Sequence, residues 1–234
     1  MRKTGGMAQE IVSIRVFGSV ARGDNDYRSD LDILAILADN QKPSEEPVND
    51  FVLKLFGEKG SISWYSYRRI RELFQEGHLF AWHIFLESKQ IAPANKTDVV
   101  NQLGEPSKYT SAYRDMASLL GILSSVKRAI IECPRNVVYE AGLIYVCTKN
   151  IALIASSFGD RRLDFSRYSP YNLNIEFVEF PLARKDYDLL IQARHSSMRG
   201  LSLPQLYKDD VTNLQMHALK WGRKIQAYFR RGGA

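Results

Sequence analysis

Short apolar blocks separated by polar turns fill the first ninety residues, and their spacing predicts strands and helices in turn. β-Branched and aromatic residues mark the predicted strands, whereas apolar side chains three and four apart mark the predicted helices. Gly77 interrupts the second helix. The pattern predicts strands over 11–19, 31–37 and 61–67, helices over 48–56 and 68–88, and a short edge strand from residue 89. This order indicates a small mixed sheet covered by helices.

The second half of the chain carries a helical pattern only. Residues 93–110 are polar and contain Pro93, Gly104 and Pro106, which places a domain boundary there. Helices are predicted beyond it over 111–132, 136–157, 179–200 and 202–231. The helix over 136–157 is apolar on most sides and should lie at the centre of a bundle. We therefore expect an α+β chain with two domains, residues 1–105 with a mixed sheet and residues 106–234 with an α-helical bundle.

The formal charge of +6 is unevenly distributed between these halves. Residues 1–106 hold 13 Lys and Arg against 15 Asp and Glu, whereas residues 107–234 hold 19 against 11. A basic half indicates an anionic partner, either nucleic acid or a nucleoside triphosphate, unless the charge serves solubility alone. The basic, amphipathic tail over 220–231 is a weaker indication of nucleic acid.

Cysteine content and hydropathy indicate the cellular compartment in which the protein is expected. Cys133 and Cys147 belong to no metal-spaced cluster, so both are expected to be reduced thiols. No stretch approaches the roughly 20 apolar residues that span a membrane. The first ten residues, MRKTGGMAQE, lack the apolar core of a signal peptide. These observations predict a cytoplasmic protein without a membrane partner.

The segment FGSVARGDNDYRSDLDILAIL, residues 17–37, places two aspartates in an otherwise apolar strand. Asp30 and Asp32 are two apart, so on a strand their carboxylates share one face. Such a pair favours a divalent cation with oxygen ligands, typically Mg²⁺ together with substrate phosphates. Gly18 allows a phosphate to approach the backbone, and the Ser19 hydroxyl can hold a terminal phosphate at the start of a helical turn. Together they predict a phosphate cradle beside a metal site.

These residues and their spacing resemble the DNA polymerase beta-like nucleotidyltransferase superfamily, especially its minimal and aminoglycoside-type members. The likeness rests on Gly18-Ser19, on Ala21-Arg22-Gly23 and on Ser29-Asp30-x-Asp32, and the element order extends it to about residue 92. It implies the nucleotidyltransferase fold, Mg²⁺ or Mn²⁺ on the aspartates, and ATP or another nucleoside triphosphate as donor. Gly18, Ser19, Arg22 and Ser29 would bind that donor, although Arg22 could instead brace the loop by pairing with Asp24 or Asp26.

The resemblance also implies transfer of a nucleoside monophosphate, with release of pyrophosphate, to a hydroxyl of a small molecule or of a partner protein, as in toxin–antitoxin pairs. A C-terminal helical bundle would complete the cleft, and a homodimer is compatible with the pattern.

The chain departs from the family at the third carboxylate, which many members carry on the next strand as a metal ligand or base. Ser61 or Ser63 stands at that place. Two carboxylates could suffice, or Glu140 on the apolar helix of the bundle could act as the third catalytic acid. In the remaining alternative, the domain is a catalytically impaired nucleotide-binding regulatory module. Glu140 could also simply pair with a cation such as Lys127 or Arg128.

Overall fold

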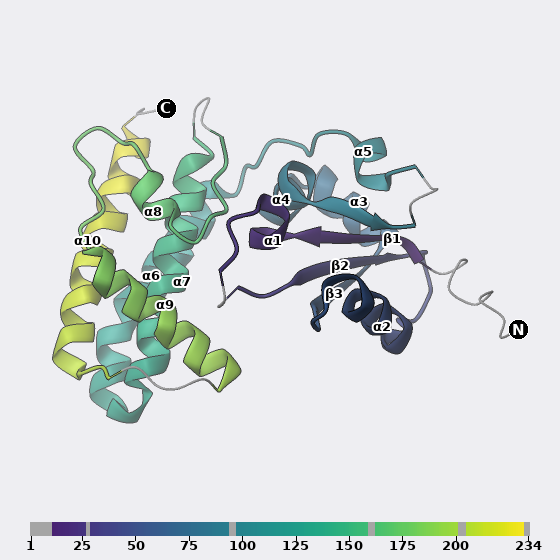
Figure 1. Ribbon diagram of the computed structural model, residues 1–234. Coiled ribbons are helices and arrows are strands. Elements are labelled where there is room, and N and C mark those ends of the chain that lie inside the picture. Colours follow the sequence, from purple (N-terminus) through teal and green to yellow (C-terminus); the bar gives the residue numbers. More distant parts are fainter. Residues whose placement is uncertain (1–10, 27–28, 94–96, 159–161, 201–204, 232–234) are drawn as a thin grey trace, which may run out of the picture. The chain divides into compact units, whose positions relative to one another are not determined.

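The computed structural model describes residues 11–26, 29–93, 97–158, 162–200 and 205–231. The chain divides into two compact units, Met1–Thr110 and Ser111–Ala234 (Figure 1). The boundary expected after residue 105 falls within the last segment of the first unit. Each unit is described below by itself.

The first unit is built on a four-stranded mixed sheet, as predicted. The strand order is β3-β2-β1-β4. β1 runs antiparallel to β2 and to β4, whereas β2 and β3 are parallel. The edge position of the short last strand is also confirmed. The strands are β1 (Ile11–Phe17), β2 (Asp32–Leu37), β3 (Ser61–Ser66) and β4 (Lys89–Ala92).

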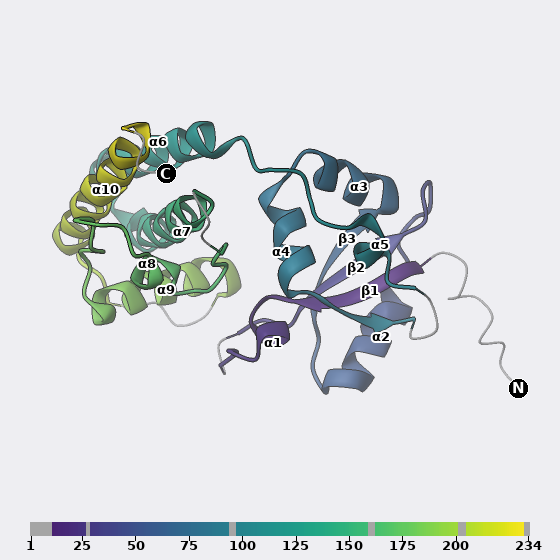
Figure 2. The ribbon, with the colours of Figure 1, turned by 90° about the horizontal axis from the view of Figure 1, so that it is seen from above.

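Helices cover both faces of this sheet (Figure 2). One face packs through Ile33 against Val48 and Val52 of α2, and the opposite face packs through Leu34 against Ile70 of α3 and Ile84 of α4. Alternate residues of β2 therefore face different helices, as the period of a strand requires. The helices of this unit are α1 (Gly18–Arg22), α2 (Glu45–Phe56), α3 (Tyr67–Gln75), α4 (Leu79–Glu87) and α5 (Val99–Leu103).

The helix predicted over 68–88 is two helices, α3 and α4, separated at Gly77 as the sequence indicated. The φ angle of Gly77 is +64°, and an added Cβ would lie 2.4 Å from the Ser107 carbonyl oxygen. The backbone therefore turns there because glycine alone fits, both by conformation and by space.

A buried arginine ties the middle of the sheet to the end of this unit. Arg15 of β1 is 2% exposed, and its Nη1 lies 2.5 Å from Oδ1 of Asp98. Its Nε donates to the Ser88 hydroxyl at 2.7 Å, and Asp98 also caps α5 by accepting from Val100 N. Burial lowers the pKa of the guanidinium, and the hydrogen bond and charge of Asp98 oppose that shift. One side chain thus joins β1, the start of β4 and α5.

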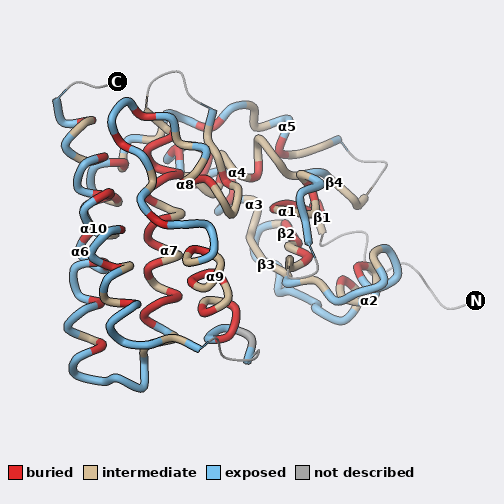
Figure 3. The backbone as a smooth tube through the Cα atoms, turned by 60° about the vertical axis from the view of Figure 1, so that its left-hand side comes forward, coloured by how far each residue is buried: buried red, intermediate tan, exposed pale blue. Residues whose placement is uncertain are grey.

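Over its described residues, the second unit is a bundle of four long α-helices with one short α-helix. α7 packs against α6, α9 and α10 and is buried along most of its length (Figure 3), so its predicted central position is confirmed. Contrary to the expectation from the sequence, the helical stretch over 134–156 is long and apolar enough to cross a membrane. In its most apolar 18-residue window, 56% of the residues are buried, as is typical of a core helix. The helices are α6 (Ala112–Glu132), α7 (Val137–Ser156), α8 (Ser169–Asn172), α9 (Arg184–Arg199) and α10 (Lys208–Arg230).

Several boundaries differ from the predicted ones for local reasons. α9 begins five residues later than expected, at Arg184, after Pro181. Proline disfavours a helical conformation in the residue before it, so the helix starts beyond this point. α5 lies in the polar segment that the sequence assigned to a linker, because Val100 is buried in the core and Val99 and Leu103 pack against it. The fourth helix, predicted over 202–231, begins at Lys208, and residues 205–207 are not helical, whereas residues 202–204 lie outside the described residues.

Candidate functional site

The candidate site lies where β1 ends and β2 begins. Phe17, the last residue of β1, pairs with Asp32, the first residue of β2. The chain then turns at Gly18, whose φ angle is +71°. A Cβ at Gly18 would lie 2.7 Å from Oδ2 of Asp32, closer than two such atoms can approach. The glycine of the bend and the second aspartate therefore lie against one another, as the sequence predicts.

Asp30 stands just outside β2. The strand begins at Asp32, although the Leu31 carbonyl already accepts a hydrogen bond from Ser61 N at 2.8 Å. Leu31 is buried between two half-exposed aspartates. This alternation is what extended backbone gives when both carboxylates point to the same side. Their shared role as metal ligands stays a prediction.

The phosphate-binding half of the site is a short turn. α1 has only five residues, so the helix dipole expected from the sequence is small. Ser19 is half-buried, and its hydroxyl makes no hydrogen bond to any residue that the structure describes. A half-buried hydroxyl without a partner among the described residues, next in the chain to Gly18, is suited to a ligand oxygen.

Arg22 and Ser29 both make contacts within the protein. Arg22 Nε lies 3.2 Å from Oδ2 of Asp24, and its Nη1 lies 2.7 Å from Oε2 of Glu87. Ser29 donates its hydroxyl to Oδ1 of Asp26 at 2.9 Å and so closes the loop before Asp30. The bracing alternative for Arg22 is thus seen with Asp24, and a contact to the donor phosphates stays a prediction for both residues.

The pairing of β2 with β3 shows which of the two candidate serines lies beside Asp32. Ser61 of β3 is the direct neighbour of Asp32, whereas Ser63 pairs with Leu34, one step further along that face. Paired residues of adjacent strands point to the same face, so Ser61 is the one beside the carboxylate. Across the described residues, no three His, Cys, Asp or Glu side chains gather in a metal-binding arrangement.

Glu140 lies in the other unit, in the first turn of α7. It is 6% exposed, and burial raises the pKa of its carboxyl group. It forms no ion pair with any described residue, and Arg128, which could have paired with it, lies 3.8 Å from Glu132. Glu140 is therefore a buried acid without a described counter-ion, and its catalytic role stays a prediction.

The raised pKa of Glu140 makes the stability of the bundle pH-dependent. When the pKa of an acid is higher in the folded state than in the unfolded state, the folded protein loses stability as the pH rises. At high pH, folding must bury the negative charge. We expect Glu140→Gln to raise the thermal unfolding midpoint at pH 8 and to leave it nearly unchanged at pH 4. Glu132→Gln, an exposed control on α6, should leave the unfolding midpoint unchanged at both pH values. Equal midpoints for Glu140→Gln and wild type at pH 8 would contradict this account.

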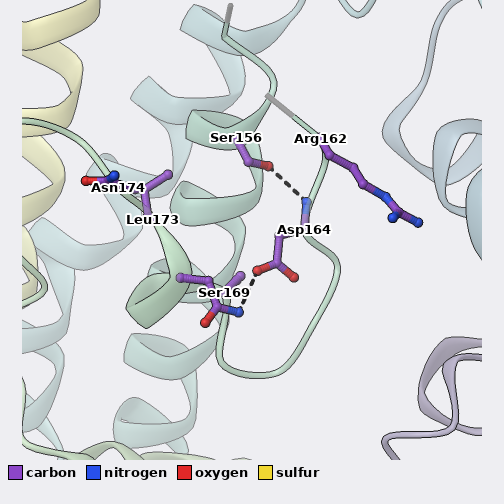
Figure 4. A pocket seen from close by; sticks show the side chains of 7 residues that line it. Ser156, Arg162, Asp164, Ser169, Leu173 and Asn174 are labelled. Carbon is purple, nitrogen blue, oxygen red and sulfur yellow. Dashed lines mark hydrogen bonds between the residues drawn. The ribbon is translucent and has the colours of Figure 1, made fainter. Parts of the chain in front are cut away.

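A cavity of about 410 Å³ lies in the second unit, beneath the loop that follows α7 (Figure 4). Its polar groups mostly bind one another: Asp164 N donates to the Ser156 hydroxyl at 3.1 Å, and Asn172 donates to Oδ2 of Asp164 at 2.9 Å. Arg162 points away from the other side chains. No residue that the sequence assigns to the site lines this cavity.

Two side chains that the sequence reading did not assign to the site contact this region. His83 and Glu87 lie one turn apart on α4, and Glu87 binds Arg22 directly. Their spacing of four on a helix is a visible signal for a pair. Arg22, the partner of Glu87, lies 65 residues away along the chain. The pairing of β4 with β1 brings α4 and the end of α1 together.

Comparison with known proteins agrees with this geometry. Residues 5–93 match the family model described as a nucleotidyltransferase domain. Comparison with curated proteins gives no match. The match spans all four strands and the glycine–serine bend, and it ends before the helical unit. Residues 5–93 are therefore a nucleotidyltransferase domain of the DNA polymerase beta-like superfamily.

Proposed function

We propose that this chain transfers a nucleoside monophosphate from ATP, or another nucleoside triphosphate, to a hydroxyl group in a metal-dependent reaction. The close approach of Gly18 to Asp32 carries the proposal. A bend that excludes even a methyl group sets the backbone that would bind phosphate directly against a carboxylate that would bind metal. Phosphoryl-type transfer depends mainly on this kind of positioning.

The roles follow from the chemistry of each group. Asp30 and Asp32 would hold Mg²⁺, or Mn²⁺, and triphosphate and water oxygens would complete its shell. The metal, when bound, would neutralise charge on the phosphates. Gly18 and Ser19 would hold the triphosphate, with Arg22 and Ser29 supporting the turn. The acceptor oxygen attacks the α-phosphorus, the bond to the bridging oxygen breaks, and pyrophosphate leaves with that electron pair.

The acceptor proton needs a destination, and Ser61 cannot accept it at neutral pH. Two carboxylates could suffice, with the proton passing to solvent. In the alternative, the proton passes to Glu140 of the helical domain, residues 106–234. The acceptor would be a small molecule or a partner protein in the cytoplasm, and the basic half leaves nucleic acid as a less favoured partner. A homodimer is compatible with this scheme.

A serine, Ser61, pairs with Asp32 on the strand where the resemblance implies a third acid, and this favours a second function, a nucleotide-binding regulatory module without catalysis. Incubation of the full chain with labelled ATP separates the two. Pyrophosphate release that needs Mg²⁺ and stops with a chelator supports the transferase. Tight, Mg²⁺-dependent binding without pyrophosphate supports the module, and absence of both refutes the nucleotide site itself.

The same assay tests Glu140. If the helical unit supplies the third acid, Glu140→Gln loses pyrophosphate release while it gains stability at pH 8. If two carboxylates suffice, activity stays at the wild-type rate with the same gain in stability.

A further inference from the structure

A charged cluster holds the phosphate-binding turn against α4. Figures 1 and 2 show α1 at the end of β1 and beside α4. Arg22, the last residue of α1, contacts Oε2 of Glu87 at 2.7 Å, and His83 Nε2 lies 3.0 Å from the same oxygen. The His83 ring also packs edge-on against Phe17, with ring centroids 5.4 Å apart. The cluster thus adjoins both ends of the bend.

Glu87 is charged in this cluster although it is only 9% exposed. Burial alone would raise the pKa of the carboxyl group, but the interactions with His83 and with Arg22 outweigh burial and hold the pKa below its usual range. A carboxylate held in this way is a poor proton acceptor near neutral pH. Glu87 therefore does not replace the third acid of the site as a base.

The turn packs into the core through Ala21 and Val20, and Arg22 adds a polar contact at its end. α1 has five residues, too few for a helix to be stable without contacts elsewhere. Its first residue follows β1 directly, and its end is closed by backbone bonds from Gly23 N and Asp24 N to the Ser19 carbonyl. Arg22 is the side chain that joins this end to α4. Without Glu87, the one partner that this guanidinium keeps among the described residues is Asp24, a neighbour within the same loop.

We propose that Glu87 is a positioning residue that, with His83 and through Arg22, holds α1 so that Gly18 and Ser19 stay against Asp32. Its value for catalysis rests on the proposed function, whereas its effect on the turn does not. Glu87 contacts no reacting atom in this scheme. It fixes the direction of the turn before a nucleotide arrives, and so reduces the ordering that binding would otherwise require.

Amide hydrogen exchange of the full chain without nucleotide tests the positioning directly. We expect Glu87→Gln to speed exchange over residues 18–24 by about tenfold, with β2 and the second unit unchanged. Glu72→Gln is the matched control, since it removes an exposed glutamate that also pairs with an arginine. Glu87→Asp, which keeps the charge, should restore part of the protection. Unchanged exchange over 18–24 in Glu87→Gln overturns the proposal.

Nucleotide binding then tests the consequence for the site. Glu87→Gln should raise the Kd for Mg²⁺-ATP about tenfold while kcat falls less than threefold. Arg22→Gln combined with Glu87→Gln should bind Mg²⁺-ATP no more weakly than Arg22→Gln alone, because Glu87 acts through Arg22. Additive losses of affinity in the double variant refute positioning. So does a Glu87→Gln variant whose unfolding midpoint falls while its Kd for Mg²⁺-ATP stays constant. Failure of the wild type to bind ATP refutes the proposed function instead, and the exchange result still decides the role of Glu87.

Discussion

Asparagine at Asp32 is expected to reduce Mg²⁺-dependent pyrophosphate release by about a thousandfold or more. The change keeps the shape of the side chain, so the pairing of Asp32 with Phe17 and with Ser61 should persist. It removes the charge that a divalent cation needs, and a transfer reaction loses the stabilisation of its developing phosphate charge. Asp30→Asn should act in the same direction.

Isothermal titration with Mg²⁺-ATP and the pyrophosphate assay measure this effect. Asp50→Asn is a suitable control, because Asp50 is an exposed aspartate on α2 of the same unit. It should leave both affinity and rate unchanged. If Asp32→Asn still binds ATP with full Mg²⁺ dependence, the metal site has been assigned to the wrong residues.

Alanine at Gly18 should be nearly as damaging, for a steric reason. The new Cβ would meet Oδ2 of Asp32 at 2.7 Å, so either the bend or the carboxylate must shift. The left-handed backbone adds strain of about 1–3 kcal/mol for a residue with a side chain. We expect the Kd for Mg²⁺-ATP to rise at least about a hundredfold, since displacement of about 1 Å at a catalytic site is costly.

Gly57 provides the matched control for this experiment. Its φ angle of +77° is close to that of Gly18, but a Cβ there would have no neighbour within 4 Å. Gly57→Ala should therefore lose a similar amount of stability from backbone strain and retain nucleotide affinity. Equal affinity losses in the two variants would show that strain, rather than the approach to Asp32, explains the effect.

Much of the fold could be predicted because each element carries its own signal. The strands were readable from β-branched runs, the break at Gly77 from its glycine, and the central position of α7 from its apolar surface. α5 was missed because its five residues, of which Val100 alone is fully buried, are too few to show a periodic pattern. The boundaries of α9 and α10 depended on loops whose structure tertiary contacts decide.

The candidate site was predictable to the extent that it is local in sequence. Gly18, Ser19, Asp30 and Asp32 lie within fifteen residues, so their spacing alone indicated a bend facing a strand. Glu87 is different, because its contact with Arg22 depends on how β4 returns to β1. Long-range ion pairs of this kind have no signature in one sequence, even when each partner is conspicuous.

The buried guanidinium of Arg15 also limits where the chain can be shortened. The family match ends at Pro93, yet the counter-ion, Asp98, lies beyond that point. Trp82 Nε1 likewise donates to the carbonyl of Ser107. A fragment that stopped at the end of the family match would leave an unneutralised cation in the sheet interior, whereas one that continued to Thr110 would keep every one of these contacts.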